Sequence, residues 1–240
     1  MVERFLVPEL ALCKESINEQ QVKILLIAGG RSPATVWLQK IAAGRIVYCA
    51  DHGLDSCLHA GVKPNYILGD GDSANSANWS WAKSAGIPFA QFPTDKDLTD
   101  TQLALRLIAE HYPHAEIILT GAWGGRFDHL FSSVFSLSRM ADKDVNLCVA
   151  DEKETLIYLK NADISFKCME IPLSISLLPL SNTCSGVSIN GVKWPLDEVT
   201  LLQDNPYAVS NVLHSANEFA VKVKEGLLGV YFCWQDFGKN

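Results

Sequence analysis

The chain has 240 residues, of which 48% are hydrophobic and 20% charged, and its formal net charge at pH 7 is −7. A chain of this length can form one or two domains and bury a substantial core. The acidic balance argues against a nucleic-acid partner, which requires a basic face. No apolar run reaches the length of a membrane span and the N-terminus has no signal-peptide pattern, so we expect a cytoplasmic protein without a membrane partner.

The number and spacing of the cysteines also favour a cytoplasmic protein. There are seven, an odd number, and no two of them form a C-x-x-C pair. Scattered cysteines of this kind are typical of reduced thiols in a cytosolic protein rather than of a disulfide framework or a zinc site.

In the first 150 residues, short apolar runs alternate with segments of helical character. Strands are predicted at residues 22–28, 46–50, 66–68, 87–92, 116–120 and 145–150. Helices are predicted at about residues 33–43, 54–60, 76–85 and 99–112, with one more ending near residue 140. This alternation predicts an α/β domain with a mainly parallel sheet over residues 1–150.

Glycine and aspartate clusters follow these strands. In open α/β sheets the carboxyl ends of the strands form the edge at which ligands bind. Gly29 and Gly30 follow the first strand, where their backbone N–H groups could approach a phosphate, although a plain strand-to-helix turn has the same pattern.

Two acidic stretches carry the clearest chemistry. Asp70 and Asp72 stand two positions apart and each follows a glycine, and residues 95–100 hold three more carboxylates and Lys96. Two carboxylates about 4 Å apart repel by roughly 4 kcal/mol at an effective dielectric near 20, and a divalent cation removes that cost. Mg²⁺ prefers oxygen ligands and commonly binds one or two carboxylates together with phosphates. These stretches therefore predict a site for Mg²⁺ and the phosphates of a nucleotide.

Residues 95–100 also have a purely structural interpretation. Thr99 and Gln102 fit a capping box, with Thr99 as N-cap, and Asp100 in the first turn suits the helix dipole. A helix cap explains Thr99 and Gln102 but leaves Asp95 and Asp97 without a role, so we expect the cap and the binding site to coexist.

After residue 150 the pattern becomes β-rich. Short strands are predicted at residues 155–159, 164–166, 173–178, 187–189, 199–202, 219–223 and 228–234. Turn residues separate them, which predicts an all-β sandwich over residues 151–240.

A few residues outside the acidic stretches also allow two interpretations. Trp194 beside a turn is either half-buried packing or a stacking surface for a flat ligand. Arg126 and Asp128 could form a simple ion pair, and Ser210-Asn211 could be ordinary polar surface.

Several ordered motifs make the chain similar to the thiamine pyrophosphokinase (thiamine diphosphokinase) family from about residue 24 onward. Residues 50–53 resemble the family's Ala-Asp-Gly-Gly, and residues 69–73 resemble Gly-Asp-Phe-Asp-Ser. Residues 95–100 follow Asp-x-Asp-x-Thr-Asp, and residues 125–129 follow Gly-Arg-x-Asp-His. The chain also resembles the family's C-terminal domain, at residues 184–187, 191–196 and 210–211.

This resemblance implies transfer of a pyrophosphoryl group from ATP to thiamine by a homodimer, with thiamine at the subunit interface. It implies four carboxylates that bind Mg²⁺ and the triphosphate, namely Asp51, Asp70, Asp72 and Asp100. ATP contacts are expected from Gly29, Gly30, Asp51, Gly53, Lys96, Asp97 and Thr99. Arg126 is expected near the reacting groups, and thiamine contacts are expected from Asp128, His129, Trp194, Ser210 and Asn211.

The chain departs from the family pattern at His52, Asp55 and Gly71. Two alternative functions are compatible with the same residues. One is a related diphosphokinase acting on another flat alcohol, such as a hydroxymethylpterin. The other is a non-catalytic sensor of thiamine or a nucleotide, although an intact acid cluster argues against a protein that only binds.

Overall fold

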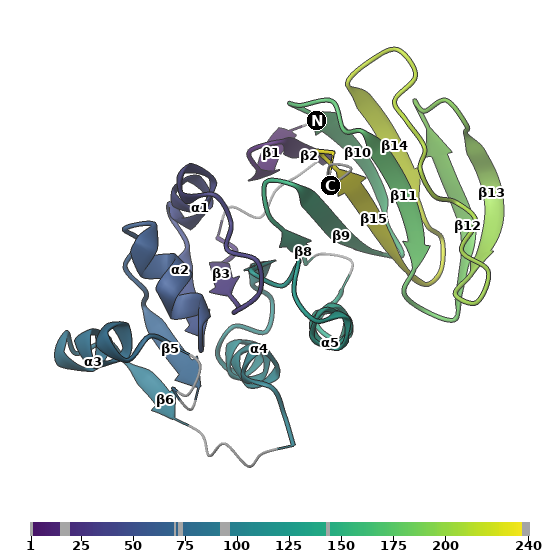
Figure 1. Cartoon of the computed structure of the whole chain (residues 1–240). Helices are drawn as coiled ribbons and strands as arrows, with labels where there is room; N and C mark the ends of the chain where they lie inside the picture. Colours follow the sequence, from purple (N-terminus) through teal and green to yellow (C-terminus); the bar gives the residue numbers. More distant parts are fainter. Residues whose placement is uncertain are drawn as a thin grey trace. The chain divides into compact units, whose positions relative to one another are not determined.

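The computed structural model describes residues 2–14, 20–69, 71, 74–91, 97–142 and 145–236. The chain divides into two compact units (Figure 1). The first, here called the α/β unit, comprises Gln21–Met140 and Val149–Asp151. The second, here called the β unit, comprises Met1–Gln20, Ala141–Cys148 and Glu152–Asn240.

The α/β unit alternates strands and helices along the chain. Its elements are β3 (Lys23–Ile27), α1 (Thr35–Ala42), β4 (Ile46–Ala50), α2 (Gly53–His59), β5 (Tyr66–Gly69), α3 (Ser76–Ser84), β6 (Phe89–Gln91), α4 (Asp100–His111), β7 (Glu116–Thr120) and α5 (Phe127–Ser138). Strand β8 (Leu147–Ala150) contributes residues to both units.

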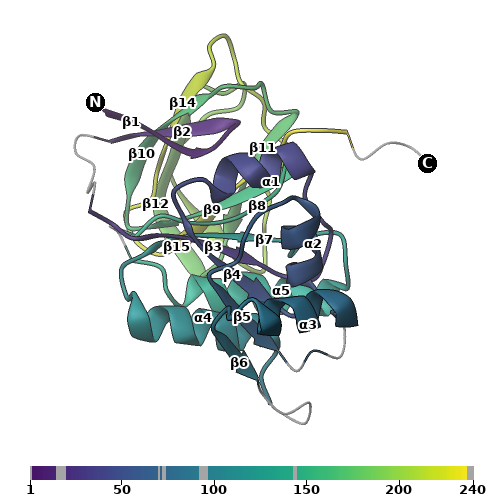
Figure 2. The same ribbon diagram turned by 90° about the vertical axis from the view of Figure 1, so that its left-hand side faces the viewer.

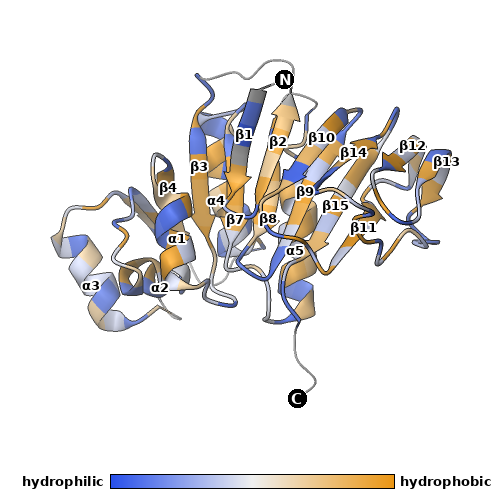
Figure 3. Ribbon diagram, turned by 90° about the horizontal axis from the view of Figure 1, so that it is seen from above, coloured by the Kyte–Doolittle hydropathy of each residue, from blue (hydrophilic) through white to orange (hydrophobic). Residues whose placement is uncertain are grey.

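The strands of the α/β unit pair in parallel, in the order β7-β3-β4-β5-β6. Every residue of β7 is buried, and four of the five residues of β3 are buried. Both strands are largely apolar, as their colour shows (Figure 3). A continuous apolar run is typical of a parallel strand that is covered on both faces, which explains why the sequence pattern located these strands.

The strand order reverses beside β3. Right-handed crossovers from β3 through β4 and β5 to β6 place α1, α2 and α3 on one face of the sheet, and the return to β7 places α4 and α5 on the other (Figures 1 and 2). The chain therefore leaves β3 and β7 toward opposite faces. In open α/β sheets such a reversal opens a crevice at the carboxyl ends of the two strands, where ligands bind.

The predicted capping box at the start of α4 is confirmed. The Gln102 backbone N–H donates to Thr99 Oγ1 at 3.2 Å, and the Thr99 backbone N–H donates to Gln102 Oε1 at 2.9 Å. Helix α4 therefore begins at Asp100, with its acidic side chain in the first turn.

The β unit holds the remaining strands. They are β1 (Val2–Val7), β2 (Leu10–Lys14), β9 (Glu154–Lys160), β10 (Asp163–Cys168), β11 (Ser174–Pro179), β12 (Thr183–Asn190), β13 (Leu196–Leu202), β14 (Glu218–Lys222) and β15 (Leu227–Cys233). Six of them form an antiparallel sheet in the order β1-β2-β10-β14-β12-β13. Strands β11, β15 and β9 pair antiparallel in that order.

Aromatic side chains join these two groups of strands. The ring centroid of Phe232 on β15 lies 5.8 Å from that of Phe166 on β10. It also lies 5.8 Å from that of Phe219 on β14. Trp234 stacks on Phe232, with the two ring centroids 5.1 Å apart. The inner faces of the strands thus share one core of alternating side chains.

The N-terminal hairpin was not predicted. Residues 2–14 were assigned to the α/β domain, but β2 pairs with β10, with Leu12 opposite Phe166. The prediction of a mainly parallel sheet over residues 1–150 therefore fails for this segment, and Ala141–Cys148 also lies in the β unit. The hairpin depends on a strand about 150 residues away, and no local sequence pattern reports such a partner.

All seven cysteines lie among the described residues, and none of them forms a disulfide. Within the described part of the chain, no helix is long and apolar enough to cross a membrane.

Candidate active site

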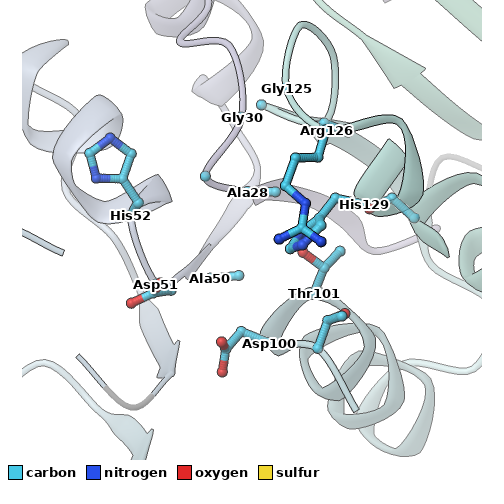
Figure 4. Close-up of a pocket in the computed structure, with 15 residues that line it drawn as sticks. Ala28, Gly30, Ala50, Asp51, His52, Asp100, Thr101, Gly125, Arg126 and His129 are labelled. Atoms are coloured by element: carbon cyan, nitrogen blue, oxygen red, sulfur yellow. The ribbon is translucent and has the colours of Figure 1, made fainter. Parts of the chain in front are cut away.

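A cavity of about 530 Å³ lies in the α/β unit, at the carboxyl ends of β3, β4 and β7 (Figure 4). It is therefore at the strand-order reversal. The predicted site residues that line it are Gly29, Gly30, Asp51, Thr99, Asp100, Arg126 and His129. Predicted residues from four separate segments thus line one cavity.

Asp51 occupies a strained turn at the end of β4. Its φ is 46°, in the left-handed region that residues other than glycine rarely adopt. Its backbone N–H donates to the Leu68 carbonyl at 2.8 Å, and its carbonyl accepts from the Leu54 N–H at 3.0 Å. Strain of this kind persists where the surroundings impose it, and it is frequent at functional sites. Here it directs an acidic side chain to the cavity.

Asp100 provides a second carboxylate. It lies in the first turn of α4, and its carboxylate points toward the side of the cavity where Asp51 lies (Figure 4). Thr99 precedes it and also lines the cavity. Thr99 Oγ1 accepts the capping hydrogen bond, so its hydroxyl proton is still available to donate to a ligand oxygen.

Two glycine-containing loops form the wall between β3 and β7. The backbone N–H of Ala28 donates to the Thr120 carbonyl at 2.8 Å, and that of Gly30 donates to the Gly121 carbonyl at 2.6 Å. A Cβ on Gly30 would lie 2.6 Å from the Gly121 oxygen, so only glycine allows this approach. Of the two interpretations of this glycine pattern, the hydrogen bond of the Gly30 N–H fits the plain turn, because that N–H holds the two loops together.

Arg31 does not line the cavity, but it stabilises the same wall. Its backbone N–H donates to the Trp123 carbonyl at 2.7 Å, and its Nη2 lies 2.6 Å from Oδ2 of Asp151. The Asp151 side chain is fully buried, whereas that of Arg31 is 20% exposed. Sequence analysis missed this pair, since 120 residues separate its members and no motif contains either.

Arg126, Asp128 and His129 begin helix α5. Arg126 Nη2 lies 2.5 Å from Asp128 Oδ2, and the His129 backbone N–H donates to Asp128 Oδ1 at 3.0 Å. The hydrogen bond from Arg126 lowers the pKa of Asp128, and Asp128 in turn raises the pKa of Arg126. Arg126 and His129 line the cavity but Asp128 does not, so Asp128 orients Arg126.

Gly53 does not line the cavity, although it was predicted to contact ATP. A Cβ at this position would lie 2.0 Å from the Ile27 carbonyl oxygen. Gly53 is therefore required for the close packing of α2 against β3. Asp97 is exposed and also lies outside the cavity lining.

The carboxylates of Asp51 and Asp100 fit a magnesium ion that arrives with a nucleotide. Mg²⁺ commonly takes one or two protein carboxylates and completes its shell with waters and phosphate oxygens. No group of three or more His, Cys, Asp or Glu residues suited to a metal occurs among the described residues, so the described part of the chain offers no all-protein cage. Asp70, Asp72 and Lys96 lie outside the described residues.

A second cavity, of about 230 Å³, lies in the β unit. Trp194 and Asn211 line it, as predicted for a ligand site, and the Trp194 residue is 55% exposed. Ser210 does not line it: its φ is 60° and its N–H donates to Ser176 Oγ at 3.0 Å. The other walls were missed by sequence analysis, and they are Ile175, Leu177, Ile189, Leu196, Tyr207, Ala208 and Val209.

Two family models match the chain. The model described as "Thiamin pyrophosphokinase, catalytic domain" matches residues 38–149, and "Thiamin pyrophosphokinase, vitamin B1 binding domain" matches residues 170–228. Among curated relatives, a thiamine pyrophosphokinase of Bacillus subtilis is 25% identical over 71% of this chain and 79% of its own length. Thiamine pyrophosphokinase 1 of Oryza sativa is 24% identical over 63% of this chain and 60% of its own length.

Solved structures show the same fold. The crystal structure of thiamine pyrophosphokinase from Bacillus subtilis matches with a TM-score of 0.77 at 22% identity, over 89% of this chain and all of that chain. Thiamin pyrophosphokinase from Candida albicans matches with a TM-score of 0.75 at 19% identity, over 89% of this chain and 90% of that chain. Since the two family models together match most of the sequence, the chain belongs to the thiamine pyrophosphokinase family.

Proposed function

We propose that the protein is a thiamine diphosphokinase, which transfers a pyrophosphoryl group from ATP to the hydroxyethyl oxygen of thiamine and releases AMP. In this proposal the α/β unit binds ATP and the β unit binds thiamine. The observation that carries it is the cavity at the strand-order reversal, which is lined by Asp51, Asp100 and Arg126. Family membership identifies the substrates.

The reaction requires one bond to form and one to break. The thiamine hydroxyl oxygen bonds to the β-phosphorus of ATP, and the bond from that phosphorus to the α–β bridging oxygen breaks. AMP leaves with the bridging oxygen. We assign acceptance of the hydroxyl proton to the Asp100 carboxylate, which lines the cavity. Arg126 offers a guanidinium to the phosphate oxygens, and such charge stabilisation and positioning account for most of the catalysis of phosphoryl transfer.

Asp51 and Asp100, together with Asp70 and Asp72, would hold Mg²⁺, and Lys96 would add a phosphate contact. When bound, the ion neutralises charge on the phosphate oxygens. We further propose that the protein is a homodimer with thiamine at the subunit interface, as the resemblance implies.

The proposed activity predicts AMP formation that depends on thiamine. Wild-type protein with ATP and Mg²⁺ should release AMP only when thiamine is added, and Asp100→Asn should abolish this release because it removes a carboxylate from the cavity. The measurement is AMP by chromatography. Glu110→Gln is the matched control, since Glu110 lies on the same helix, is exposed and pairs with Arg106.

The same assay separates the alternative functions. AMP release that is indifferent to thiamine but depends on a hydroxymethylpterin would favour a related diphosphokinase. Absence of AMP with every acceptor, combined with measurable binding of thiamine or ATP, would favour a sensor.

Trp194 is predicted to bind the thiamine ring through its open face. The Lys193 ammonium lies 4.7 Å from the centroid of the Trp194 ring and covers one face. Trp194→Ala should raise the thiamine KM by roughly 2- to 30-fold, the equivalent of about 0.5–2 kcal/mol of cation–π interaction, with the ATP KM unchanged. Lys193→Met should lower the thiamine KM modestly, because the ammonium competes with the cationic thiazolium for the same ring.

The control for this prediction is Trp81→Ala, which removes a tryptophan of similar exposure from the other unit. It should leave the thiamine KM as in wild type. A thiamine KM that does not change in Trp194→Ala would remove Trp194 from the binding site.

A further inference from the structure

We infer that Asn211 is a positioning residue. Its side-chain amide fixes the turn that contains Trp194, and this turn determines where the Trp194 indole lies in the wall of the β-unit cavity. The family resemblance implied a direct contact between Asn211 and thiamine. The inference concerns the same site in more detail, and its ligand rests on the proposed function.

The Asn211 side chain forms hydrogen bonds with both backbone groups of Trp194, its N–H and its carbonyl. Its Oδ1 accepts from the Trp194 N–H at 3.1 Å, and its Nδ2 donates to the Trp194 carbonyl at 2.6 Å. One amide therefore satisfies both backbone groups of Trp194, as a neighbouring strand would. Oδ1 also accepts from the Val212 N–H at 3.0 Å, so both of its lone pairs are engaged within the protein.

The backbone of Asn211 is itself hydrogen-bonded to that of Ile175. Its N–H donates to the Ile175 carbonyl at 2.8 Å, and its carbonyl accepts from the Ile175 N–H at 2.7 Å. Ile175 belongs to β11 and is fully buried. Asn211 therefore connects the Trp194 turn to a fully buried residue of β11.

This connection sets the shape of the cavity. Ile175 and Leu177 of β11 form one wall, and Trp194 forms another. The Trp194 residue is 55% exposed, so side-chain packing alone constrains it weakly, and its backbone must supply the remaining restraint. Lys193 adds to that restraint, since its N–H donates to the Val212 carbonyl at 2.9 Å.

The test combines a measurement on the ligand-free protein with a binding measurement. The indole N–H resonance of Trp194 is identified in a ¹⁵N-labelled sample by its absence in Trp194→Phe, and it is then followed in Asn211→Ala and Asn211→Asp. Thiamine Kd is measured by calorimetry, and the ATP KM by AMP formation. Asn217→Ala is the matched control, because Asn217 Nδ2 also donates to a backbone carbonyl, that of Cys168, in the same unit.

Both Asn211 variants should shift and broaden the Trp194 resonance without any ligand, because each loses the donor to the Trp194 carbonyl. They should raise the thiamine Kd at least 10-fold and leave the ATP KM unchanged, whereas Asn217→Ala should change none of the three. An unchanged Trp194 resonance with weakened thiamine binding would overturn the inference and make Asn211 a direct ligand contact. Wild-type protein that does not bind thiamine would overturn the proposed function, while the resonance would still decide the role of Asn211.

Discussion

Asp51→Asn is expected to lower kcat/KM by roughly 10²–10³-fold, the loss typical of removing one preorganised group that stabilises charge in the transition state. The free energy of unfolding should hardly change. Asparagine tolerates the left-handed conformation at φ 46°, so the turn after β4 survives while the negative charge in the cavity is lost. The measurements are steady-state kinetics and urea unfolding, together with the Mg²⁺ dependence of ATP binding.

Two further substitutions separate the effect of the Asp51 carboxylate from the effect of its left-handed backbone conformation. Asp51→Gly also removes the carboxylate but relieves the strain, so it should lose as much kcat/KM as Asp51→Asn and be at least as stable as wild type. Asp51→Ala removes the carboxylate but keeps a β-carbon in the left-handed region, so it should be roughly 1–2 kcal/mol less stable than Asp51→Gly. Wild-type kcat/KM in Asp51→Asn would show that Asp51 serves only the turn and holds neither metal nor nucleotide.

Arg31→Met is expected to reduce the free energy of unfolding by roughly 3–5 kcal/mol, because it leaves the Asp151 carboxylate buried without its cationic partner. The Asp151 side chain is fully buried, and the Arg31 guanidinium lies 2.6 Å away. The substitution should also lower kcat/KM, since Arg31 adjoins the Gly30–Gly121 hydrogen bond in the cavity wall. Urea unfolding and AMP formation measure the two effects.

A double substitution tests the cause. Asp151→Asn in the Arg31→Met background removes the buried charge and should restore part of the lost stability. Arg106→Met is the surface control: its ion pair with Glu110 is 70% and 58% exposed, and pairs of that kind contribute roughly 0–1 kcal/mol. If Arg31→Met were no more destabilising than Arg106→Met, the Arg31–Asp151 pair would not support the wall.

Local patterns were sufficient for the elements of the α/β unit. Buried parallel strands are continuous apolar runs, so β3, β4 and β7 were visible in the sequence. The capping box was visible because its two residues are three positions apart and contact each other directly. The position of the site followed from the same regularity, since loops after parallel strands meet at one edge of the sheet.

Long-range contacts changed the roles of individual residues. The glycine pattern left Gly30 open to a phosphate contact or a plain turn, and its N–H donates to the Gly121 carbonyl. The resemblance assigned Asn211 to thiamine, and its side-chain amide forms hydrogen bonds with Trp194, 17 residues away. A motif shows which residue types occur near a site, but it does not show which hydrogen-bonding groups the fold itself consumes.

The sequence by itself determined the order of strands and helices in the α/β unit, the start of α4, and the segments that supply Asp51 and Asp100. Each of these depends on residues close together in the chain. Only the tertiary structure decided that β2 pairs with β10, that Arg31 neutralises Asp151, and that Asn211 forms hydrogen bonds with Trp194. Their partners come from segments distant in sequence, and the energy of such a contact exists only after folding has brought the partners together.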